Sequence, residues 1–560
     1  MKKNDFRLSL WQTWQVIKPY WLSRSSPLGW LILLSVLLLT SIGAVFQVTL
    51  AQISGEIINA LTEHNRERSI RQGTLYLAGQ IIALLMSSAS SYLRLYLQNI
   101  WRRWLSDEYI KKYLSDRGYF RIQNKIDNPD QRIQEDIDSL TDGSLNTIDT
   151  LLGSISGLIA ASIALQKVSP ALLLGILAYA LVSTLISYGL FGRILKELTF
   201  LQLKKEADFR FSLIRLGNYA ESIAFYQGEP QEQQQISQRL DRAIENEKQV
   251  VLWQYGYQPS FQDLADRLPF FLTMLMLAPR VFSKHIKIGI LQQSRENVFT
   301  VYQSFSAGFN QVTNLTSLAA AGERIYALSN ELKIFSDIPG EGIRTVDVIR
   351  DGGFKIQHLT LLTPDKKRTL ISDLCLSLSK QDRLLILGES GTGKSSLLRV
   401  LAGLWQTGTG SLQLPQYGSC FFLPQKPYLV GGTILEELKY PKDNQTLTQK
   451  ELEKILEKVK LADLLEWIGQ KQNLGSILSI GEQQRLAFAR LFLSEADYVF
   501  LDEATSALDQ ETEDYLYNQL IESKATLISV SHRSNLIKYH NKILRLNCDQ
   551  TWQLEICQIK

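Results

Sequence analysis

The sequence predicts a multidomain protein in which an all-α transmembrane domain of six helices is followed by an α/β P-loop domain. Three observations predict this fold class. Long apolar stretches are confined to residues 29–318. After residue 350, short β-rich runs alternate with helical patterns. Within that second part, a glycine-rich loop separates a buried strand from a helix.

The bulk composition limits the possible functions. The chain has 560 residues, enough for two or more domains, and a net charge of only +4. For this length, such a charge gives no reason to expect a nucleic-acid partner, and we predict none. The cysteines lie in the C-terminal part without a CxxC pair, so we expect reduced packing residues rather than metal ligands. They are Cys375, Cys420, Cys548 and Cys557.

Residues 29–51 predict the first transmembrane helix, because they are uncharged and match the ~20 residues that cross a bilayer core. No small-residue cleavage site follows promptly, which favours a retained span over a signal peptide. Residues 1–28 mix aromatic and basic side chains, as is typical of an amphipathic segment in the headgroup region. A tail without structure is the alternative. These side chains are Arg7, Trp11, Trp14, Lys18, Tyr20, Trp21 and Arg24.

Five further spans complete the predicted transmembrane domain, residues 29–334. They lie at 74–97, 146–166, 170–191, 250–282 and 286–318. Charged groups at mid-bilayer depth cost at least ~2.5–3.5 kcal/mol, so they normally face a bundle interior or water. We therefore predict a polar cargo cavity, with structural ion pairs between helices as an equally weighted alternative. The candidate residues are Arg94, Asp263, Arg267, Arg295, Glu296, Gln303 and Asn310.

Residues 335–349 contain Pro339 and Gly340 and predict a linker to the second domain, residues 350–560. In that domain the strand 384–387 leads into a P-loop of the form GxxxxGK[ST], followed by a helical pattern. Backbone N–H groups of such a loop and the helix N-terminus surround phosphate groups. The loop residues are Gly388, Glu389, Ser390, Gly391, Thr392, Gly393, Lys394, Ser395 and Ser396.

Particular side chains near this loop have predicted roles in binding ATP and Mg²⁺. Lys394 neutralises charge on the β- and γ-phosphates, and the Ser395 hydroxyl is a ligand for Mg²⁺. A second buried strand, 498–501, ends in Asp502 and Glu503. A carboxylate at that place holds Mg²⁺, and its neighbour orients and deprotonates an attacking water. We therefore assign Asp502 to the metal and Glu503 to general-base catalysis. The alternative is that the strand simply ends in two solvated acidic residues without a catalytic role.

The stretch LSIGEQQR, residues 478–485, is a second candidate for phosphate contact. It combines a serine, a glycine and a helix N-terminus, although one P-loop already surrounds the α- and β-phosphates. If two copies pair head to tail, each stretch can cover the γ-phosphate held by the other copy. We therefore predict a homodimer with ATP contacts made in trans by Leu478, Ser479, Ile480, Gly481 and Glu482.

Together these motifs resemble those of the ATP-binding cassette (ABC) family over essentially the whole chain. The resemblance identifies residues 388–395 as Walker A, 478–482 as the signature and 499–502 as Walker B. It implies that Gln425 contacts Mg²⁺ and senses the γ-phosphate. It also implies that His532 contacts the γ-phosphate and helps position water, and that Asp509 of the D-loop contributes in trans. The implied cofactors are ATP and Mg²⁺, with Ser395, Gln425 and Asp502 at the metal.

Within that family, the chain is most similar to the fused permease-ATPase half-transporters of the peroxisomal acyl-CoA/cobalamin subfamily and to bacterial relatives of the SbmA/BacA type. The stretches NPDQRI, EADFRF and NYAESIAFYQGE carry this similarity. It implies a type IV, exporter-like membrane fold, with coupling helices near 128–136 and 218–228; charged, solvated helix faces are the alternative. The sequence departs from the common pattern at Thr363, where exporters of this type stack an aromatic ring on adenine. It departs again in the signature, which carries Ile480 and Glu482.

The predicted function is a homodimeric, ATP-hydrolysing transporter in a bacterial inner membrane, with the ATPase domain in the cytoplasm. Relatives imply a hydrophilic or amphipathic cargo, such as a peptide, a cobalamin-like compound or an acyl-CoA-like molecule, and favour uptake. An ATP-gated channel or regulator is the alternative, although Glu503 and His532 argue for hydrolysis. A soluble ABC ATPase acting on DNA or ribosomes is a third hypothesis. It would be expected to show long coiled coils or a basic face, and neither is visible in the sequence.

Overall fold

The computed structural model describes residues 3–23, 26–123, 125–334, 346–351, 353–405, 407–441 and 447–557. The chain divides into two compact units, Met1–Ser336 and Asp337–Lys560. Most of the predicted linker, residues 335–345, lies outside the described residues. The first strand of the second unit begins at Asp347, within the range predicted for the linker.

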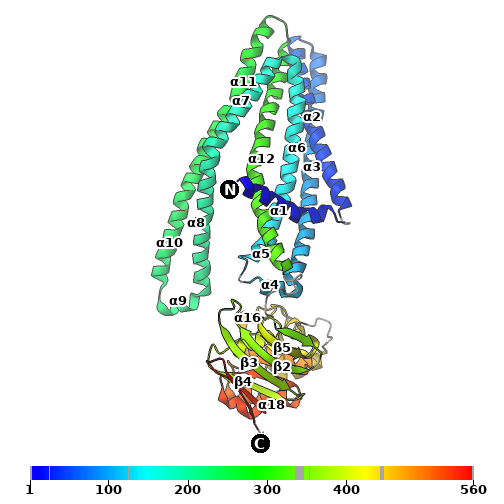
Figure 1. Cartoon of the computed structure of the whole chain (residues 1–560). Coiled ribbons are helices and arrows are strands. Elements are labelled where there is room, and N and C mark those ends of the chain that lie inside the picture. The colour runs from blue at the N-terminus through cyan, green and yellow to red at the C-terminus, as the bar shows by residue number, and fades with distance from the viewer. Residues whose placement is uncertain are drawn as a thin grey trace. The chain divides into compact units, whose positions relative to one another are not determined.

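The first unit is built from helices; α1 lies across the others in Figure 1, and the other long helices run lengthwise. Their bounds are α1 Lys3–Trp21, α2 Pro27–Thr62, α3 Arg66–Leu114, α6 Ile137–Val168, α7 Pro170–Ser187, α8 Arg193–Asn218, α10 Glu229–Val251, α11 Gln258–Phe282 and α12 Ile288–Ile334. The short helices are η1 Ser115–Arg117, α4 Gly118–Arg121, α5 Pro129–Gln131 and α9 Ala220–Tyr226. π-helical segments join some of them: η2 Arg132–Asp136, η3 Tyr188–Gly192 and η4 Leu252–Tyr257.

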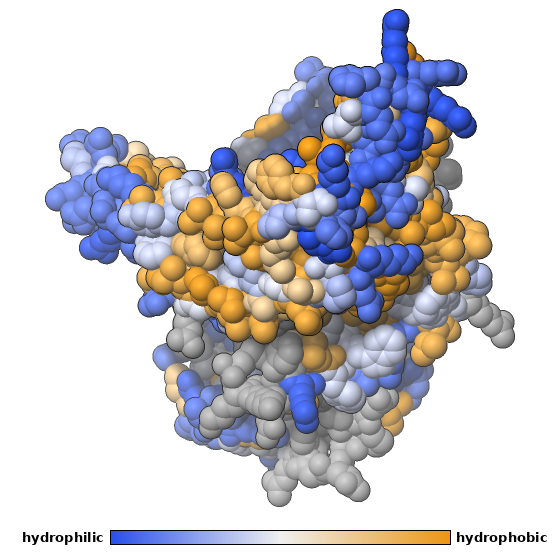
Figure 2. Space-filling view, turned by 90° about the horizontal axis from the view of Figure 1, so that it is seen from above, coloured by the Kyte–Doolittle hydropathy of each residue, from blue (hydrophilic) through white to orange (hydrophobic). Residues whose placement is uncertain are grey.

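Among the described residues, four helical stretches are long and apolar enough to cross a bilayer. They are Pro27–Thr62, Arg66–Arg121, Pro129–Val168 and Pro170–Asn218, and they contain the first four predicted spans. The fifth and sixth predicted spans fall in helices α11 and α12, which carry more polar residues. The count of six spans therefore stays a prediction. Hydrophobic residues cover much of the surface seen in Figure 2, as expected for a domain in contact with lipid.

Helix α1 is amphipathic and packs against the bundle. Its buried residues Val16 and Tyr20 face α3 and α12, and the Tyr20 ring stacks on Trp101 with 5.7 Å between centroids. Trp11 and Trp14 are about half exposed. A helix with aromatic side chains on its outer side suits a bilayer interface, which is the location that the sequence predicts.

Helices α8 and α10 form a long hairpin with α9 at its tip (Figure 1). Asn246 of α10 donates hydrogen bonds to the Leu198 carbonyl (3.0 Å) and to Gln202 (2.9 Å) of α8, which tie the two helices together. Helix α9 coincides with the short helix expected near 218–228. The segment 128–136 differs in form, because α5 and η2 lead directly into α6 rather than forming a separate helix.

The second unit contains two sheets. Its strands are β1 Asp347–Arg350, β2 Phe354–Leu362, β3 Thr369–Leu378, β4 Arg383–Gly388, β5 Gly408–Leu414, β6 Cys420–Leu423, β7 Tyr498–Asp502, β8 Thr526–Val530, β9 Lys542–Leu546 and β10 Trp552–Ile556. One sheet has the order β1-β5-β2-β3, and the other has the order β10-β9-β4-β8-β7-β6. The second sheet is parallel except for β10, and buried runs fill its central strands.

Helices in this unit cover the parallel sheet. Their bounds are α13 Lys394–Leu401, α14 Ile434–Lys439, α15 Gln449–Lys458, α16 Leu474–Ile477, α17 Ile480–Ser494 and α18 Gln510–Glu522, with 3-10 turns η5 Tyr417–Ser419, η6 Ala462–Trp467 and η7 Ser534–Tyr539. One hydrophobic core joins both sheets to α13, and another joins the parallel sheet to α14–α18. Because β4, β7 and β8 are parallel, their carboxyl ends meet at one edge, where ligands of open α/β sheets bind.

Candidate functional site

The P-loop runs from the end of β4 to the start of α13. Gly391 and Gly393 have φ angles of 85° and 98°, in the left-handed region that glycine adopts without strain. Lys394 is buried, and its Nζ donates to the carbonyls of Gly388 (2.8 Å) and Glu389 (2.7 Å). Burial lowers the pKa of this ammonium below its usual value. The loop therefore forms a closed turn around a buried cation, which suits phosphate binding.

Ser395 connects the P-loop to the end of β7. Its hydroxyl donates to Asp502 Oδ1 across 3.2 Å. Burial is the largest influence on Asp502 and raises the pKa of its carboxyl group. Within the described residues, Asp502 forms no ion pair. The structure thus brings two of the three residues predicted at Mg²⁺, Ser395 and Asp502, together beside Lys394.

Glu503 contacts both of the other residues predicted to act in catalysis. Gln425 Nε2 donates to Glu503 Oε2 (3.1 Å), and His532 Nε2 lies 2.9 Å from Glu503 Oε1. Glu503 adopts a left-handed φ of 47°, and its backbone N–H donates to the Val530 carbonyl of β8. This bond fixes the backbone, while the side chain lies between the loops after β6 and β8. Gln425, Glu503 and His532 therefore form one cluster, although 78 and 29 residues separate them along the chain.

The signature stretch forms the N-terminus of α17. Ser479 is its N-cap, and Glu482 closes a capping box by accepting hydrogen bonds from the Ser479 backbone N–H and hydroxyl. Hydrogen bonds from Ser479 lower the pKa of Glu482. Leu478 is buried, whereas Ile480 is 62% exposed. In the described part of the chain, no hydrogen bond or ion pair joins this stretch to the P-loop of the same molecule.

The structure adds Gln484, which the sequence analysis missed. This residue of α17 is fully buried. Its Nε2 donates to the Gln425 carbonyl and to Ser506 Oγ, each at 3.2 Å, and its Oε1 accepts from the Ala507 N–H at 3.1 Å. One amide side chain thus links α17 to Gln425 and to residues 506–507, which belong to the D-loop that ends at Asp509. Its position two residues after the signature was the available signal, but its contacts are with residues far away in the sequence.

The predicted D-loop residue Asp509 is the N-cap of α18. Its Oδ1 accepts from the Thr512 N–H at 2.8 Å, and its Oδ2 accepts from the Thr512 hydroxyl at 2.9 Å. These bonds lower the pKa of the carboxyl group. Arg533 next to His532 donates to the Ser506 carbonyl at 2.9 Å. The D-loop is therefore held by the helix on one side and by the His532 loop on the other.

A buried ion pair joins Arg490 of α17 to Glu437 of α14. Glu437 also accepts from the Gly431 N–H at 2.8 Å, and Arg490 donates to the Tyr428 carbonyl at 2.6 Å. The pair therefore fixes the segment that follows Gln425.

Replacing Arg490 with Met is expected to lower the free energy of unfolding of this unit by about 3–5 kcal/mol, because Glu437 keeps a buried charge without a partner. Denaturation of the full-length protein in detergent measures the effect. The control is Arg545→Met, which breaks an exposed pair with Glu555 and should cost about 1 kcal/mol or less. Equal losses in the two variants would contradict the role of Arg490.

Thr363 lies in the turn between β2 and β3. Its hydroxyl donates to Asp365 Oδ1 at 2.5 Å, and its backbone N–H donates to the Arg368 carbonyl at 2.9 Å. The side chain therefore closes the turn. A threonine offers no ring to stack on adenine, so this position lacks the aromatic contact that is usual in exporters of this type.

The first unit contains a cavity of about 700 Å³ between α2, α11 and α12. Three of the predicted cargo residues line it, Arg267, Arg295 and Glu296. Asp266, which the sequence analysis did not select, lines it as well. The Arg295 guanidinium lies 5.9 Å from the centroid of the Phe270 ring. The cavity thus offers both signs of charge next to aromatic side chains.

The remaining candidates take other positions. Gln303 donates to Asp266 Oδ1 at 3.2 Å and so supports the cavity wall. Arg94 pairs with Asp142 of α6 at 3.1 Å. Asp263 pairs with Arg267 across one turn of α11 at 3.3 Å, with both side chains exposed. The side chain of Asn310 lies outside the described residues. For Arg94, the structure therefore shows an ion pair between helices, as the alternative expects, whereas the Asp263 pair lies within α11.

Comparisons with known proteins agree with a membrane-spanning first unit and a nucleotide-binding second unit. Residues 17–282 match the family described as ABC transporter transmembrane region 2, and residues 371–506 match the ABC transporter family. An uncharacterized ABC transporter ATP-binding protein of Synechocystis is 35% identical over 85% of this chain and 74% of its own length.

Two further relatives are named as members of the D family of ABC transporters. The chloroplastic ABC transporter D family member 2 of Arabidopsis thaliana is 33% identical over 98% of this chain and 88% of its own. The human lysosomal cobalamin transporter ABCD4 is 31% identical over 81% of each chain. The protein therefore belongs to the ABC transporter family, related to the D-family half-transporters, and its ATPase activity is coupled to transport across a membrane.

Proposed function

We propose that this protein works as a homodimer that uses ATP hydrolysis to take up a hydrophilic or amphipathic solute. The observation that carries the proposal is the separation, within one molecule, of a P-loop and an exposed signature turn. Ile480 is exposed, and the α17 N-terminus makes no described hydrogen bond to its own P-loop. A second copy placed head to tail would let each α17 N-terminus complete the phosphate site of the other copy.

Each residue at the nucleotide site has a proposed task. Lys394 and the N–H groups of the loop would bind the phosphates, and Ser395 and Asp502 would hold Mg²⁺. Their hydroxyl and carboxylate oxygens match the ligands that this ion prefers, and the partly buried Asp502 lacks a described ion-pair partner. Bound Mg²⁺ would neutralise charge on the phosphates. Gln425 would also contact Mg²⁺, and Asp509 would contribute to the site in trans.

Glu503 is the proposed general base. Its carboxylate accepts a hydrogen bond from Gln425 and lies within 2.9 Å of His532. These contacts orient it, so that it can accept a proton from a water that attacks the γ-phosphate. His532 then contacts the γ-phosphate and helps position that water. Ile480 and Glu482, where the signature departs from the common pattern, would change the hydrogen-bond donors that the partner subunit offers to the γ-phosphate.

We propose that α9 and the segment 128–136 transmit closure of the ATPase domains to the membrane helices. Phe225 and Tyr226 of α9 are 78% and 86% exposed, and they offer an apolar docking surface at the tip of the α8–α10 hairpin. Segment 128–136 is attached to α12, because Asp136 pairs with Arg324. Movement of either segment would therefore reach helices that line the cavity.

The cavity supports a cargo that carries charge and some apolar surface. Arg295 and Glu296 offer opposite charges, and Phe270 offers an aromatic face. Such a site would leave a plain lipid with charged groups that it could not pair. The related human protein is named a cobalamin transporter, and a cobalamin-like solute, a peptide or an acyl-CoA-like molecule fits the same chemistry. We place the protein in a bacterial inner membrane, with its ATPase domain cytoplasmic.

Transport in proteoliposomes tests this proposal. External ATP energises the copies whose ATPase domains face outward, so uptake into a cell corresponds to loss of cargo from the lumen. We expect ATP-dependent loss of at least one luminal cargo from a panel of peptides, cobalamin and acyl-CoA. Glu503→Gln should abolish this loss. ATP-dependent flow that only follows the concentration gradient and persists in Glu503→Gln would instead identify an ATP-gated channel.

The same assay tests the cavity. For a cargo with an anionic group, Arg295→Met should raise the KM by about tenfold, the effect of losing one charged hydrogen bond of about 1.4 kcal/mol. Arg242→Met is the matched control, because Arg242 is exposed on α10. An unchanged KM in Arg295→Met would remove Arg295 from the cargo site.

A further inference from the structure

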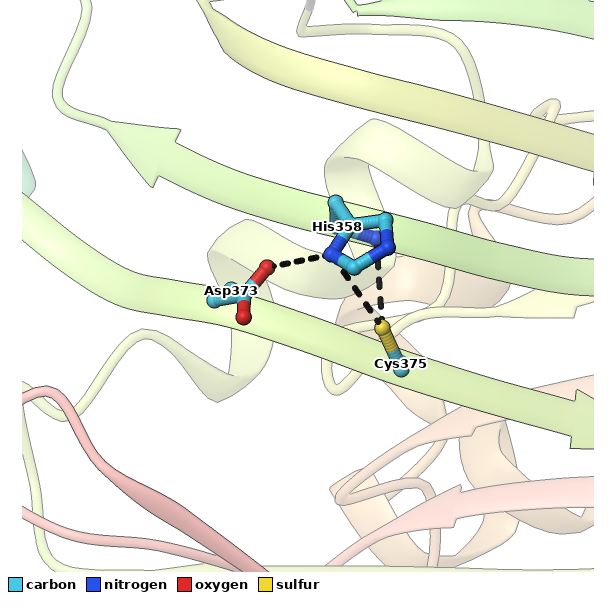
Figure 3. Close-up of side chains that lie close together, drawn as sticks. All are labelled: His358, Asp373 and Cys375. Carbon is cyan, nitrogen blue, oxygen red and sulfur yellow. Dashed lines mark hydrogen bonds and ion pairs between the residues drawn. The ribbon is translucent and has the colours of Figure 1, made fainter.

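The β2–β3 hairpin carries a cluster of three metal-ligating side chains outside the nucleotide site: His358, Asp373 and Cys375 (Figure 3). One donor atom from each lies within 4.8 Å of the others. His358 Nδ1 is 2.7 Å from Asp373 Oδ1 and 3.8 Å from Cys375 Sγ. The sequence analysis predicted a packing role for Cys375. The structure instead places this thiol beside an imidazole and a carboxylate.

Two irregularities in the strand pairing bring these donors together. The register shifts once between Ile356 and Leu359, and again between Leu359 and Leu361. At these shifts His358 and Asp373 adopt left-handed φ angles of 49° and 53°. Such bulges re-aim side chains relative to a regular pleat. The two strands therefore direct one donor from β2 toward two donors from β3.

The local contacts also hold the sulfur in place. The backbone N–H of His358 donates to Cys375 Sγ at 3.3 Å, so the sulfur faces the irregular part of β2 that carries the imidazole. The side chains of His358 and Asp373 are 78% and 73% exposed, which leaves the cluster accessible from solvent. A cation could enter without a change in the fold, and water could fill a remaining coordination position.

We propose that His358, Asp373 and Cys375 bind a divalent cation of the zinc class. A thiolate, an imidazole and a carboxylate are the ligands of four-coordinate zinc sites, in which water can supply the fourth ligand. Mg²⁺ and Ca²⁺ prefer oxygen ligands, such as the pair formed by Ser395 and Asp502. The two sites therefore select different ions. The bound ion takes the place of the shared hydrogen between His358 and Asp373 and joins β2 to β3.

Cobalt binding to the full-length protein in detergent tests this proposal. Co²⁺ replaces Zn²⁺ in such sites, and coordination by sulfur gives a thiolate-to-cobalt charge-transfer absorption that oxygen ligands do not produce. Excess Mg²⁺ keeps the ATP site from binding the probe. We expect this absorption to saturate at one Co²⁺ per chain and to disappear when Zn²⁺ is added. Cys375→Ser should abolish it.

Matched variants separate this site from adventitious binding. Asp373→Asn keeps a residue that tolerates a left-handed backbone, and it should weaken Co²⁺ binding at least about tenfold. Cys548→Ser is the control, because Cys548 is an exposed thiol 3.3 Å from the Glu389 carboxylate. It should leave the absorption unchanged. Absence of the band in the unmodified protein, or its persistence in Cys375→Ser, would overturn the proposal.

Discussion

Replacing Glu503 with Gln is expected to reduce steady-state ATP hydrolysis by about 10²–10⁴-fold, the usual contribution of a positioned general base. The amide keeps the size of the side chain and one carbonyl oxygen, but it does not accept a proton from water at neutral pH. Contacts to Gln425 and His532 orient the carboxylate in the unmodified protein. Phosphate release in nanodiscs at saturating Mg²⁺ and ATP measures the effect.

The control for this prediction is Glu511→Gln. Glu511 lies on α18 with its side chain 90% exposed, and it forms a surface pair with Lys460. This variant should hydrolyse ATP at the rate of the unmodified protein, because such pairs contribute little. Binding of a fluorescent ATP analogue should persist in Glu503→Gln, which separates a lost chemical step from a lost site. Hydrolysis by Glu503→Gln above one tenth of the normal rate would contradict the assignment.

The nucleotide site could be predicted in large part because its sequence signals are local. A strand, a glycine-rich loop and a helix follow one another within residues 383–401, so spacing alone places Lys394 and Ser395. Asp502 and Glu503 follow a run of buried residues, and the sheet topology brings them to the same edge. The apolar length of the first four spans is likewise a property of consecutive residues.

Contacts that depend on tertiary packing could not be read from spacing. Gln484 and the Arg490–Glu437 pair are recognisable only once α17 packs against its neighbours. The choice between Asp263 and Asp266 depends on the rotation of α11. The π-helical segment η4 directly precedes that helix and changes its phase, so a regular 3.6-residue period does not locate the cavity face. The juxtaposition of His358 and Asp373 could not be predicted either, because the bulges interrupt the regular alternation of side chains along β2 and β3.

The largest qualitative effect is expected from mixed dimers. When one subunit carries Lys394→Ala and the other carries Ser479→Arg, one of the two pockets combines an intact P-loop with an intact signature. We expect this dimer to hydrolyse ATP at up to half of the normal rate if the two pockets act independently. Dimers with either mutation in both subunits should be inactive, because every pocket then lacks a phosphate-binding cation or carries an arginine at the α17 N-terminus.

The reverse arrangement supplies a matched control. A dimer of one unmodified subunit and one subunit with both mutations contains the same four residues at these positions. Here each pocket receives one mutation, so hydrolysis should be lost. If every chain completed its own site, the outcomes would be exchanged: this dimer would be active and the first would be inactive. Two affinity tags, used in sequence, isolate each mixed dimer for the measurement.

Rescue in the first arrangement also settles whether the variants fold. Ser479→Arg removes the N-cap of α17, which costs about 1 kcal/mol and could by itself lower activity. A misfolded subunit could not restore hydrolysis to its partner, whereas an intact one supplies its P-loop. Activity in one arrangement and inactivity in the other therefore depends only on which chain completes each pocket. Under the proposed dimer, that dependence would be the physical basis for coupling, because ATP would then favour the closed pair through contacts that a separate subunit lacks.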